Sequence, residues 1–167
     1  LLAGAFISLG AVFFTVVVTQ TDLGFGVTRL LGGLSFCLGL VLVVVAGAEL
    51  FTGNNLIAMA WASGKIRTRV LLRSWLLVYV GNVVGCLGTV VLVVWSGIDG
   101  LGNGAVGETA VAIAKAKAEL TPGEAFARGI LCNALVCLAV WLTIGARSVT
   151  DKVLAVVFPI TAFVALG

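Results

Sequence analysis

The sequence predicts an all-α integral membrane protein, and three observations support this prediction. Hydrophobic residues make up 61% of the 167 residues and charged residues only 10%, whereas soluble domains carry about 25% charged residues. The mean hydropathy is +1.24, so the chain lacks the polar atoms to cover a surface that faces water. The apolar residues also form long runs, close to the ~20 residues that a membrane-crossing helix needs. We therefore expect the lipid bilayer to surround this chain.

We expect the chain to form a single transmembrane domain over residues 1–167, with five membrane-crossing segments. The apolar runs lie at 1–18, 27–48, 70–95, 122–144 and 149–167, the last one incomplete, with a short half-helix at 54–62 after the second. Both ends of the sequence fall inside apolar runs. We expect no cleavable signal peptide, because the first run has no basic flank before it.

Two of these helices have well-marked starts. Thr121 and Pro122 are followed by Glu124, which places a capping residue, a first-turn proline and an acid at the spacing of a capping box. Ser148 and Asp151 form a weaker version of the same pattern before the last run. These local signals agree with the boundaries of the apolar runs.

The charges of the connections predict the orientation. The connections at 64–73 and 145–152 carry a net positive charge, whereas those at 19–26 and 96–121 carry a net negative charge. Cytoplasmic loops of membrane proteins are enriched in Lys and Arg. The alternation therefore places the beginning of the first helix in the cytoplasm.

Glu49 is an acidic residue in the middle of an apolar region. It follows about twenty apolar residues, a length that spans a bilayer, and Thr52, Asn54 and Asn55 come directly after it. A charge at membrane depth is costly and marks a functional candidate, and the flanking Gly and Asn residues favour a broken helix that lines a cavity. The alternative is that the helix ends near Gly47 and Glu49 lies in an interfacial loop.

Three polar residues of the second half of the chain have two interpretations each. Lys115 and Lys117 lie in an Ala-rich stretch, and they are either solvated loop charges or, for one of them, a charge that attracts an anion into a vestibule. Asn133 lies among apolar residues of the run at 122–144. It serves either as a hydrogen-bonding contact between helices or as a donor in a pore.

Catalytic and cofactor-binding patterns are absent from the sequence. It contains no histidine and no GxSxG, HExxH or P-loop motif, so we expect no enzyme, no cofactor and no metal site. The cysteines lie in apolar runs without metal-site spacing and are expected to be small core residues: Cys37, Cys86, Cys132 and Cys137. Pairs of glycines are expected where helices pack closely: Gly4 and Gly10, Gly33 and Gly39, and Gly81 and Gly85.

Several segments resemble the formate/nitrite transporter family. Residues 47–54 (GAELFTGN) are similar to the acidic-Leu-Phe-Thr break in the second helix of that family. Residues 129–141 (GILCNALVCLAVW) are similar to its fourth-helix signature, residues 3–7 (AGAFI) to the start of its first helix, and residues 147–152 (RSVTDK) to the approach to its fifth. The similarity covers essentially the whole chain in the same order.

The resemblance implies an aquaporin-like six-helix fold with two inverted three-helix repeats, in which the second and fifth helices are broken. It also implies a homopentamer with one pore in each subunit. The fifth helix of the family breaks just after the position of Gly167, at a Phe-Glu-His segment. We therefore expect the fold to be truncated here in the fifth helix, before the histidine that faces the pore.

The resemblance also assigns residues at the helix break. The loop contributes Leu50, Phe51 and Thr52 to the substrate path, and the Thr52 hydroxyl faces the passing anion. Glu49 and Asn54 are then structural polar residues of the break.

Further positions follow from the same resemblance. Phe36 and Leu40 correspond to a constriction on the cytoplasmic side and Phe163 to the opposite constriction. Lys117, rather than its neighbour Lys115, matches the vestibule lysine of the family. Asn133 matches an asparagine near that lysine.

The function implied is a channel for small monovalent anions of weak acids in a prokaryotic inner membrane, with formate ranked before nitrite and with no nucleic acid as a partner. Hydrosulfide, acetate or lactate are alternatives within the family. A membrane anchor subunit would be expected to show haem-ligating histidines or a cluster of redox cysteines, and neither is found. A neutral-solute pore of the aquaporin type would be expected to contain Asn-Pro-Ala motifs, and no Asn-Pro dipeptide occurs.

Overall fold

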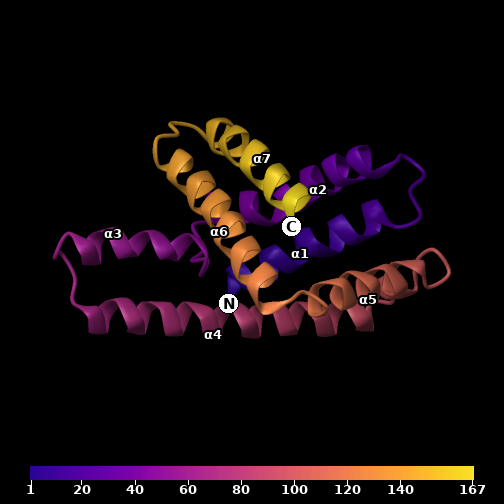
Figure 1. Cartoon of the computed structure of the whole chain (residues 1–167), viewed down its shortest axis with the longest axis horizontal. Coiled ribbons are helices and arrows are strands. Elements are labelled where there is room, and N and C mark those ends of the chain that lie inside the picture. The colour runs from indigo at the N-terminus through magenta and orange to yellow at the C-terminus, as the bar shows by residue number, and fades with distance from the viewer.

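A computed structural model describes residues 1–167, and its regular structure consists of helices alone (Figure 1). The elements are α1 (Leu2–Val18), α2 (Phe25–Ala46), η1 (Gly53–Leu56), α3 (Ile57–Ala62), α4 (Thr68–Trp95), η2 (Ile98–Gly100), α5 (Ala105–Ala118), α6 (Pro122–Ile144) and α7 (Val149–Leu166).

Four of these helices, α2, α4, α6 and α7, are long and apolar enough to cross a membrane. Helix α1 is also apolar, with a length of 17 residues. Only 19 of the 167 residues are buried, so most of the apolar side chains cover the outside of the molecule. Because such a surface is stable in lipid and not in water, the chain is a multi-pass membrane protein.

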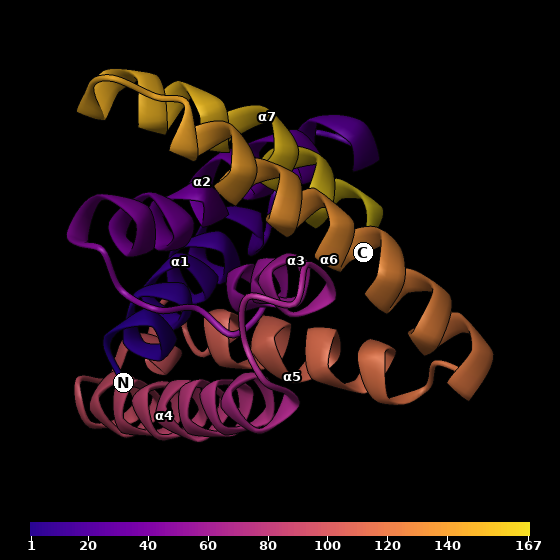
Figure 2. The ribbon, with the colours of Figure 1, turned by 90° about the vertical axis from the view of Figure 1, so that its left-hand side faces the viewer.

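The long helices pack in the order α4, α1, α2, α7 and α6, each against the next (Figure 2). The apolar core lies along this stack, and Leu40, Val156 and Ile160 are its largest fully buried side chains. They come from α2 and α7, so the contact between these two helices is the most completely enclosed part of the molecule. This contact positions the residues of the candidate site.

The capping boxes predicted for the last two long helices are confirmed. At the start of α6, the Glu124 backbone N–H donates to Thr121 Oγ1 (3.4 Å) and the Thr121 N–H donates to the Glu124 carboxylate (3.0 Å). At the start of α7, the Asp151 N–H donates to Ser148 Oγ (3.1 Å) and the Ser148 N–H donates to the Asp151 carboxylate (3.0 Å). The side chains therefore satisfy the free backbone N–H groups at both helix starts.

The glycines expected at helix contacts lie at such contacts. A Cβ added to Gly10 of α1 would lie 2.9 Å from the Gly39 nitrogen of α2, and one added to Gly33 would lie 2.9 Å from the Thr161 Cα of α7. Gly4 lies against the Asn82 backbone of α4. The absence of a side chain at these positions therefore lets α1, α2, α4 and α7 approach one another closely.

The connection between α4 and α6 differs from a simple loop. It contains η2 and the 14-residue helix α5, which contacts η2 and α1. The Ala-rich stretch favours helix, but its low hydropathy gave no signal of a membrane-crossing run. In Figure 1, α5 runs back from the end of the molecule at which α4 ends toward its middle, where α6 begins.

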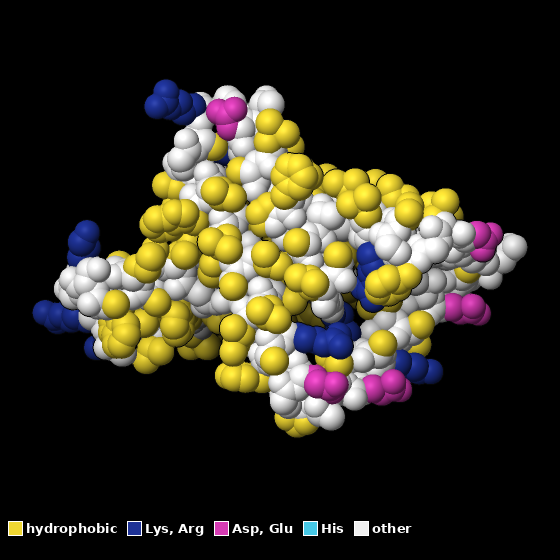
Figure 3. Space-filling model, turned by 45° about the horizontal axis from the view of Figure 1, so that its top comes forward, with side chains coloured by type: hydrophobic (Ala, Val, Ile, Leu, Met, Phe, Trp, Pro, Cys, Tyr) yellow, Lys and Arg dark blue, Asp and Glu magenta, His cyan; other side chains and the backbone are white.

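Two connections carry basic side chains at their tips, and further Lys and Arg side chains lie nearer the middle of the molecule in Figure 3. Figure 3 shows Lys and Arg at the tips formed by the α3–α4 and α6–α7 connections, with apolar side chains covering the area between the charged groups. The α3–α4 connection contains Lys65 and Arg67, and the α6–α7 connection contains Arg147. Both basic tips lie on the same side of Figure 1, as expected for a protein whose basic loops share one side of a membrane.

Replacing Gly10 by alanine is expected to lower the stability of the protein by about 1–3 kcal/mol, because overpacking forces backbones apart. The new Cβ would lie 2.9 Å from both the Gly39 nitrogen and the Phe36 carbonyl oxygen. The midpoint of thermal unfolding in detergent measures the effect. Gly88→Ala is the matched control, since no atom lies within 4 Å of its added Cβ. Equal midpoints for the two variants would contradict close packing at Gly10.

Candidate functional site

The second long helix is broken, as predicted. Helix α2 ends at Ala46, and Gly47 adopts a left-handed conformation (φ 68°) that favours glycine. The chain then runs without helix until η1 begins at Gly53, where the Asn54 N–H donates to the Leu50 carbonyl oxygen (2.8 Å). The short helices η1 and α3 follow the break, as expected for a half-helix after it.

One side chain of α4, that of Asn82, bonds twice to the backbone of this break. The Asn82 Nδ2 group donates to the Glu49 carbonyl oxygen (3.0 Å), and the Phe51 N–H donates to Asn82 Oδ1 (2.9 Å). The Asn82 amide thereby satisfies two backbone groups that no helix satisfies. Asn82 was not predictable from the sequence, because an asparagine in the middle of an apolar run gives no indication of its partner.

Other side chains hold the rest of the break. Trp75 Nε1 of α4 donates to the Asn54 carbonyl oxygen (3.2 Å), and the Tyr79 ring packs edge-on against the Phe51 ring with centroids 5.3 Å apart. From α6, the Cys137 thiol donates to the Thr52 carbonyl oxygen (3.4 Å). The break is thus fixed between α4 and α6.

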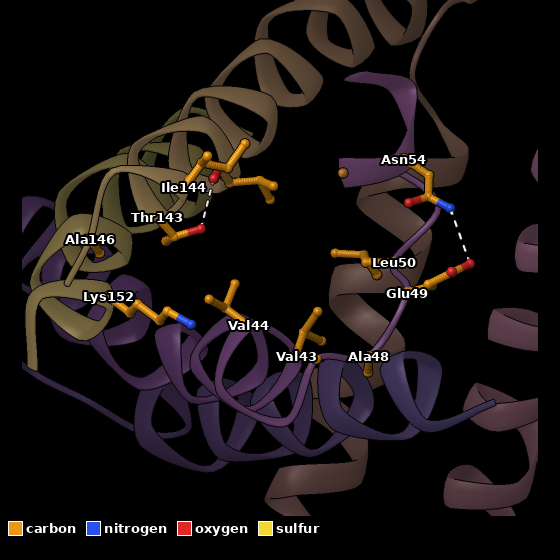
Figure 4. Close-up of a pocket in the computed structure, with 13 residues that line it drawn as sticks. Val43, Val44, Ala48, Glu49, Leu50, Asn54, Thr143, Ile144, Ala146 and Lys152 are labelled. Atoms are coloured by element: carbon orange, nitrogen blue, oxygen red, sulfur yellow. Dashed lines mark hydrogen bonds between the residues drawn. The ribbon is translucent and has the colours of Figure 1, made fainter. Parts of the chain in front are cut away.

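A cavity of about 460 Å³ opens beside the break (Figure 4). It is lined by residues of α2, the break, α6 and the start of α7: Val43, Val44, Gly47, Ala48, Glu49, Leu50, Gly53, Asn54, Val140, Thr143, Ile144, Ala146 and Lys152. In Figure 4, Leu50 points into the cavity, whereas Glu49 turns away toward Asn54, whose Nδ2 donates to its carboxylate (3.4 Å). Lys152 is the only basic residue of the lining.

From the sequence, Lys152 contributed only to the prediction of the membrane orientation. Its side chain extends toward Val44 at the edge of the cavity (Figure 4). The Thr143 hydroxyl faces the same space, although it donates to the Val140 carbonyl oxygen (2.7 Å). The cavity therefore has one cation on a wall that is otherwise mostly apolar.

The two phenylalanines expected at opposite constrictions lie side by side, so that expectation is wrong. The ring centroids of Phe36 and Phe163 are 5.8 Å apart. The reason is that α2 and α7 pack against each other and approach from opposite ends of the molecule (Figure 1), which brings the middle of α2 to the end of α7. Leu40, one turn further along α2, is 1% exposed and lies between this aromatic pair and the Val43–Val44 wall of the cavity.

Lys117 and Asn133 both lie toward the end of α7. Helix α5 brings Lys117 to this place, where its ammonium group donates to the Gly167 carbonyl oxygen. Lys117 is exposed but does not simply extend into solvent, because it has this partner. Asn133 Oδ1 is buried without a hydrogen-bond partner, and its neighbour Cys132 lies beside Gly167.

No group of three His, Cys, Asp or Glu side chains is arranged to hold a metal ion, and the four cysteines are unpaired. The site instead consists of an apolar pair, a broken helix and two separate cations. Comparison with known proteins gives it a family. The formate/nitrite transporter family matches residues 1–167. The chain belongs to this family.

Curated relatives of the family are similar over nearly the whole chain. The formate channel FocA of Haemophilus influenzae is 43% identical over 166 residues, and the formate channel FocA of Escherichia coli K12 is 45% identical over 166 residues. Each alignment covers 99% of this chain and 58% of the relative. The chain therefore spans a little over half the length of these formate/nitrite transporters.

Solved structures of the family have the same fold. A pentameric formate channel with formate bound superposes with a TM-score of 0.92 at 48% identity, covering 98% of this chain and 64% of that chain. A second structure, an ion channel of the same family, superposes with a TM-score of 0.88 at 31% identity, covering 99% of this chain and 65% of that one. The chain thus shares its fold with both of these structures over nearly its whole length.

The pairing of Phe36 and Phe163 is expected to show as a coupling between the two positions. Alanine at both positions should cost less stability than the sum of the single changes, by about 0.5–1.5 kcal/mol, because aromatic pairs contribute this much beyond their buried area. Chemical unfolding of the four proteins in detergent measures it. Pairing Phe36→Ala with Phe158→Ala is the control, since Phe158 on the same helix is 80% exposed. Additive effects for Phe36 and Phe163 would contradict the contact.

Proposed function

We propose that this chain forms the greater part of a channel for small monovalent anions of weak acids, with formate as the first substrate and nitrite as the second. The observation that carries the proposal is the broken α2, which presents Leu50 to a cavity and Thr52 to α6. The relatives named formate channels support this choice of substrate.

The arrangement of charge supports anions rather than cations. Lys152 lies at the cavity beside the end of α6, and Lys117 lies at the end of α7. Cations at a pore entrance raise the local concentration of anions and speed their entry. Glu49 is the acidic residue of the cavity lining, and its carboxylate turns toward Asn54 and away from the cavity (Figure 4).

Between the two cations the path is apolar. Phe36 and Phe163 form an aromatic pair, and Leu40 follows it. Transfer of a charged group into apolar surroundings is far more costly than transfer of a neutral one. We propose that the apolar section favours a small weak acid, which crosses it with its proton bound, over ions that stay charged.

We also propose the assembly and location of the protein. More large apolar side chains are exposed than buried in the single chain, so other subunits or lipid must cover them. The pentameric neighbour supports a homopentamer with lipid around it. A prokaryotic inner membrane is consistent with the basic tips on one side of the molecule.

Uptake of formate into liposomes by the full-length protein is expected to fall on the order of tenfold in Lys117→Met, because the field that attracts the anion is lost.

Thr52→Val should lower formate uptake about fivefold, because a hydroxyl hydrogen bond contributes about 1 kcal/mol. Stopped-flow measurements with formate and nitrite at two pH values test both, and uptake should rise at the more acidic pH. Lys115→Met is the control for Lys117. Wild-type liposomes that admit no small anion faster than empty ones would refute the proposal.

Lys152→Gln is expected to lower formate flux several-fold at low ionic strength and to lower it less as salt is added. Salt screens exposed charges with a Debye length of about 10 Å at 0.1 M, so a purely electrostatic role fades with salt. Arg147→Gln is the matched control, because Arg147 lies five residues before Lys152, in the α6–α7 connection, but does not line the cavity. A flux defect that is equal at all salt concentrations would contradict an electrostatic role for Lys152.

A further inference from the structure

One face of α4 is built to meet the broken part of α2. Trp75, Tyr79 and Asn82 are spaced four and three residues apart, so they share one side of the helix. Each of them contacts a different point of the break between Glu49 and Asn54. None of the three was a candidate functional residue on sequence grounds.

Asn82 is the centre of this face. Its amide donates to the Glu49 carbonyl oxygen (3.0 Å) and accepts from the Phe51 N–H (2.9 Å). These two backbone groups lie on either side of Leu50, and they have opposite polarity. A carboxamide can serve both at once, because it carries a donor and an acceptor. A carboxylate at this position would leave the Glu49 carbonyl oxygen unpaired, and an apolar side chain would leave both groups unpaired.

The position of Asn82 is itself fixed by packing. Gly4 of α1 lies against the Asn82 backbone, where any side chain would collide. One turn further along α4, the Cys86 thiol donates to the Gly4 carbonyl oxygen (3.3 Å). The contact between α1 and α4 therefore sets the depth at which the Asn82 amide meets the break.

The consequence concerns Leu50. Its two neighbours in the chain are tied to Asn82, and its own carbonyl oxygen accepts from the Asn54 N–H (2.8 Å). Its side chain points into the cavity (Figure 4). With the backbone held on both sides, Leu50 has little freedom to move out of the path, and Thr52 is placed by the same bonds.

We propose that Asn82 is a positioning residue for selectivity: its two hydrogen bonds hold Leu50 in the path, so that the cavity admits the smallest monocarboxylates and excludes larger ones. This proposal rests on the proposed channel function. It assigns the positioning of Leu50 to α4, a helix that itself contributes no residue to the cavity lining.

Two substitutions of Asn82 separate the two bonds, and a third substitution on the same helix serves as the control. Asn82→Asp keeps the shape and the acceptor for the Phe51 N–H but loses the donor to the Glu49 carbonyl oxygen. Asn82→Leu is similar in size and loses both. Thr89→Val is the matched control on the same helix, because the Thr89 hydroxyl bonds only to the Gly85 carbonyl oxygen one turn earlier (3.0 Å).

The experiment measures uptake of formate and of lactate by the full-length protein in liposomes. The ratio of formate to lactate uptake is expected to fall about fivefold or more in Asn82→Leu and by a smaller factor in Asn82→Asp, and to stay unchanged in Thr89→Val. Thermal unfolding in detergent is measured beside it. A lower unfolding midpoint with an unchanged uptake ratio in both Asn82 variants would reduce Asn82 to a structural contact and overturn the proposal.

A second measurement does not need transport. Hydrogen–deuterium exchange of the peptide that contains residues 47–54 should be faster in Asn82→Leu, because the Phe51 N–H loses its acceptor, and close to wild type in Asn82→Asp. Unchanged exchange in Asn82→Leu would overturn the proposal even if the channel conducts. Wild-type protein that exchanges as expected but conducts no anion would refute the channel function and leave the two hydrogen bonds established. If Asn82→Leu does not fold, the isosteric Asp variant carries the uptake measurement, in which a lower ratio of formate to lactate uptake is still expected and an unchanged ratio would overturn the proposal.

Discussion

The fold depends on one constraint: every backbone N–H and C=O group at membrane depth needs a partner inside the protein. A continuous helix meets this demand by itself, but α2 stops at Ala46 and leaves groups of the following segment, such as the Glu49 carbonyl oxygen and the Phe51 N–H, without a helical partner. Asn82, Trp75 and Cys137 supply partners from α4 and α6. The break is stable because neighbouring helices satisfy it, and those helices can come close because glycines such as Gly4 and Gly10 lie at their contacts.

The same constraint connects structure to function. A helix that breaks at membrane depth exposes polar backbone and frees side chains to face a cavity, and here that cavity receives Leu50 on one side and Lys152 on the other. The apolar pair of Phe36 and Phe163 lies beyond it along α2. The proposed passage of a small acid that enters as an anion and crosses as a neutral molecule rests on this order of cations near the ends and apolar groups between them.

Several features were predictable from local sequence because their causes are local. The capping boxes at Thr121 and Ser148 follow from residues three positions apart, and the broken helix follows from Glu49 and its polar neighbours within one apolar region. The glycine contacts were predictable as a class, although the partner of each glycine was not. The resemblance to the formate/nitrite transporters added the expected roles of the residues at the break. The family match confirms that the chain belongs to this family.

The sequence by itself determined the membrane environment, the long apolar helices and the place where one of them breaks, because hydropathy, capping and a charge within an apolar region act over short distances along the chain. Only the tertiary structure decided which residues meet. Phe36 and Phe163 form one layer instead of two because α2 and α7 approach from opposite ends, and Asn82 became the partner of the break because α1 and α4 pack through Gly4. Such pairings join residues far apart in the chain, and they depend on the angle and depth at which helices pack, which no local pattern encodes.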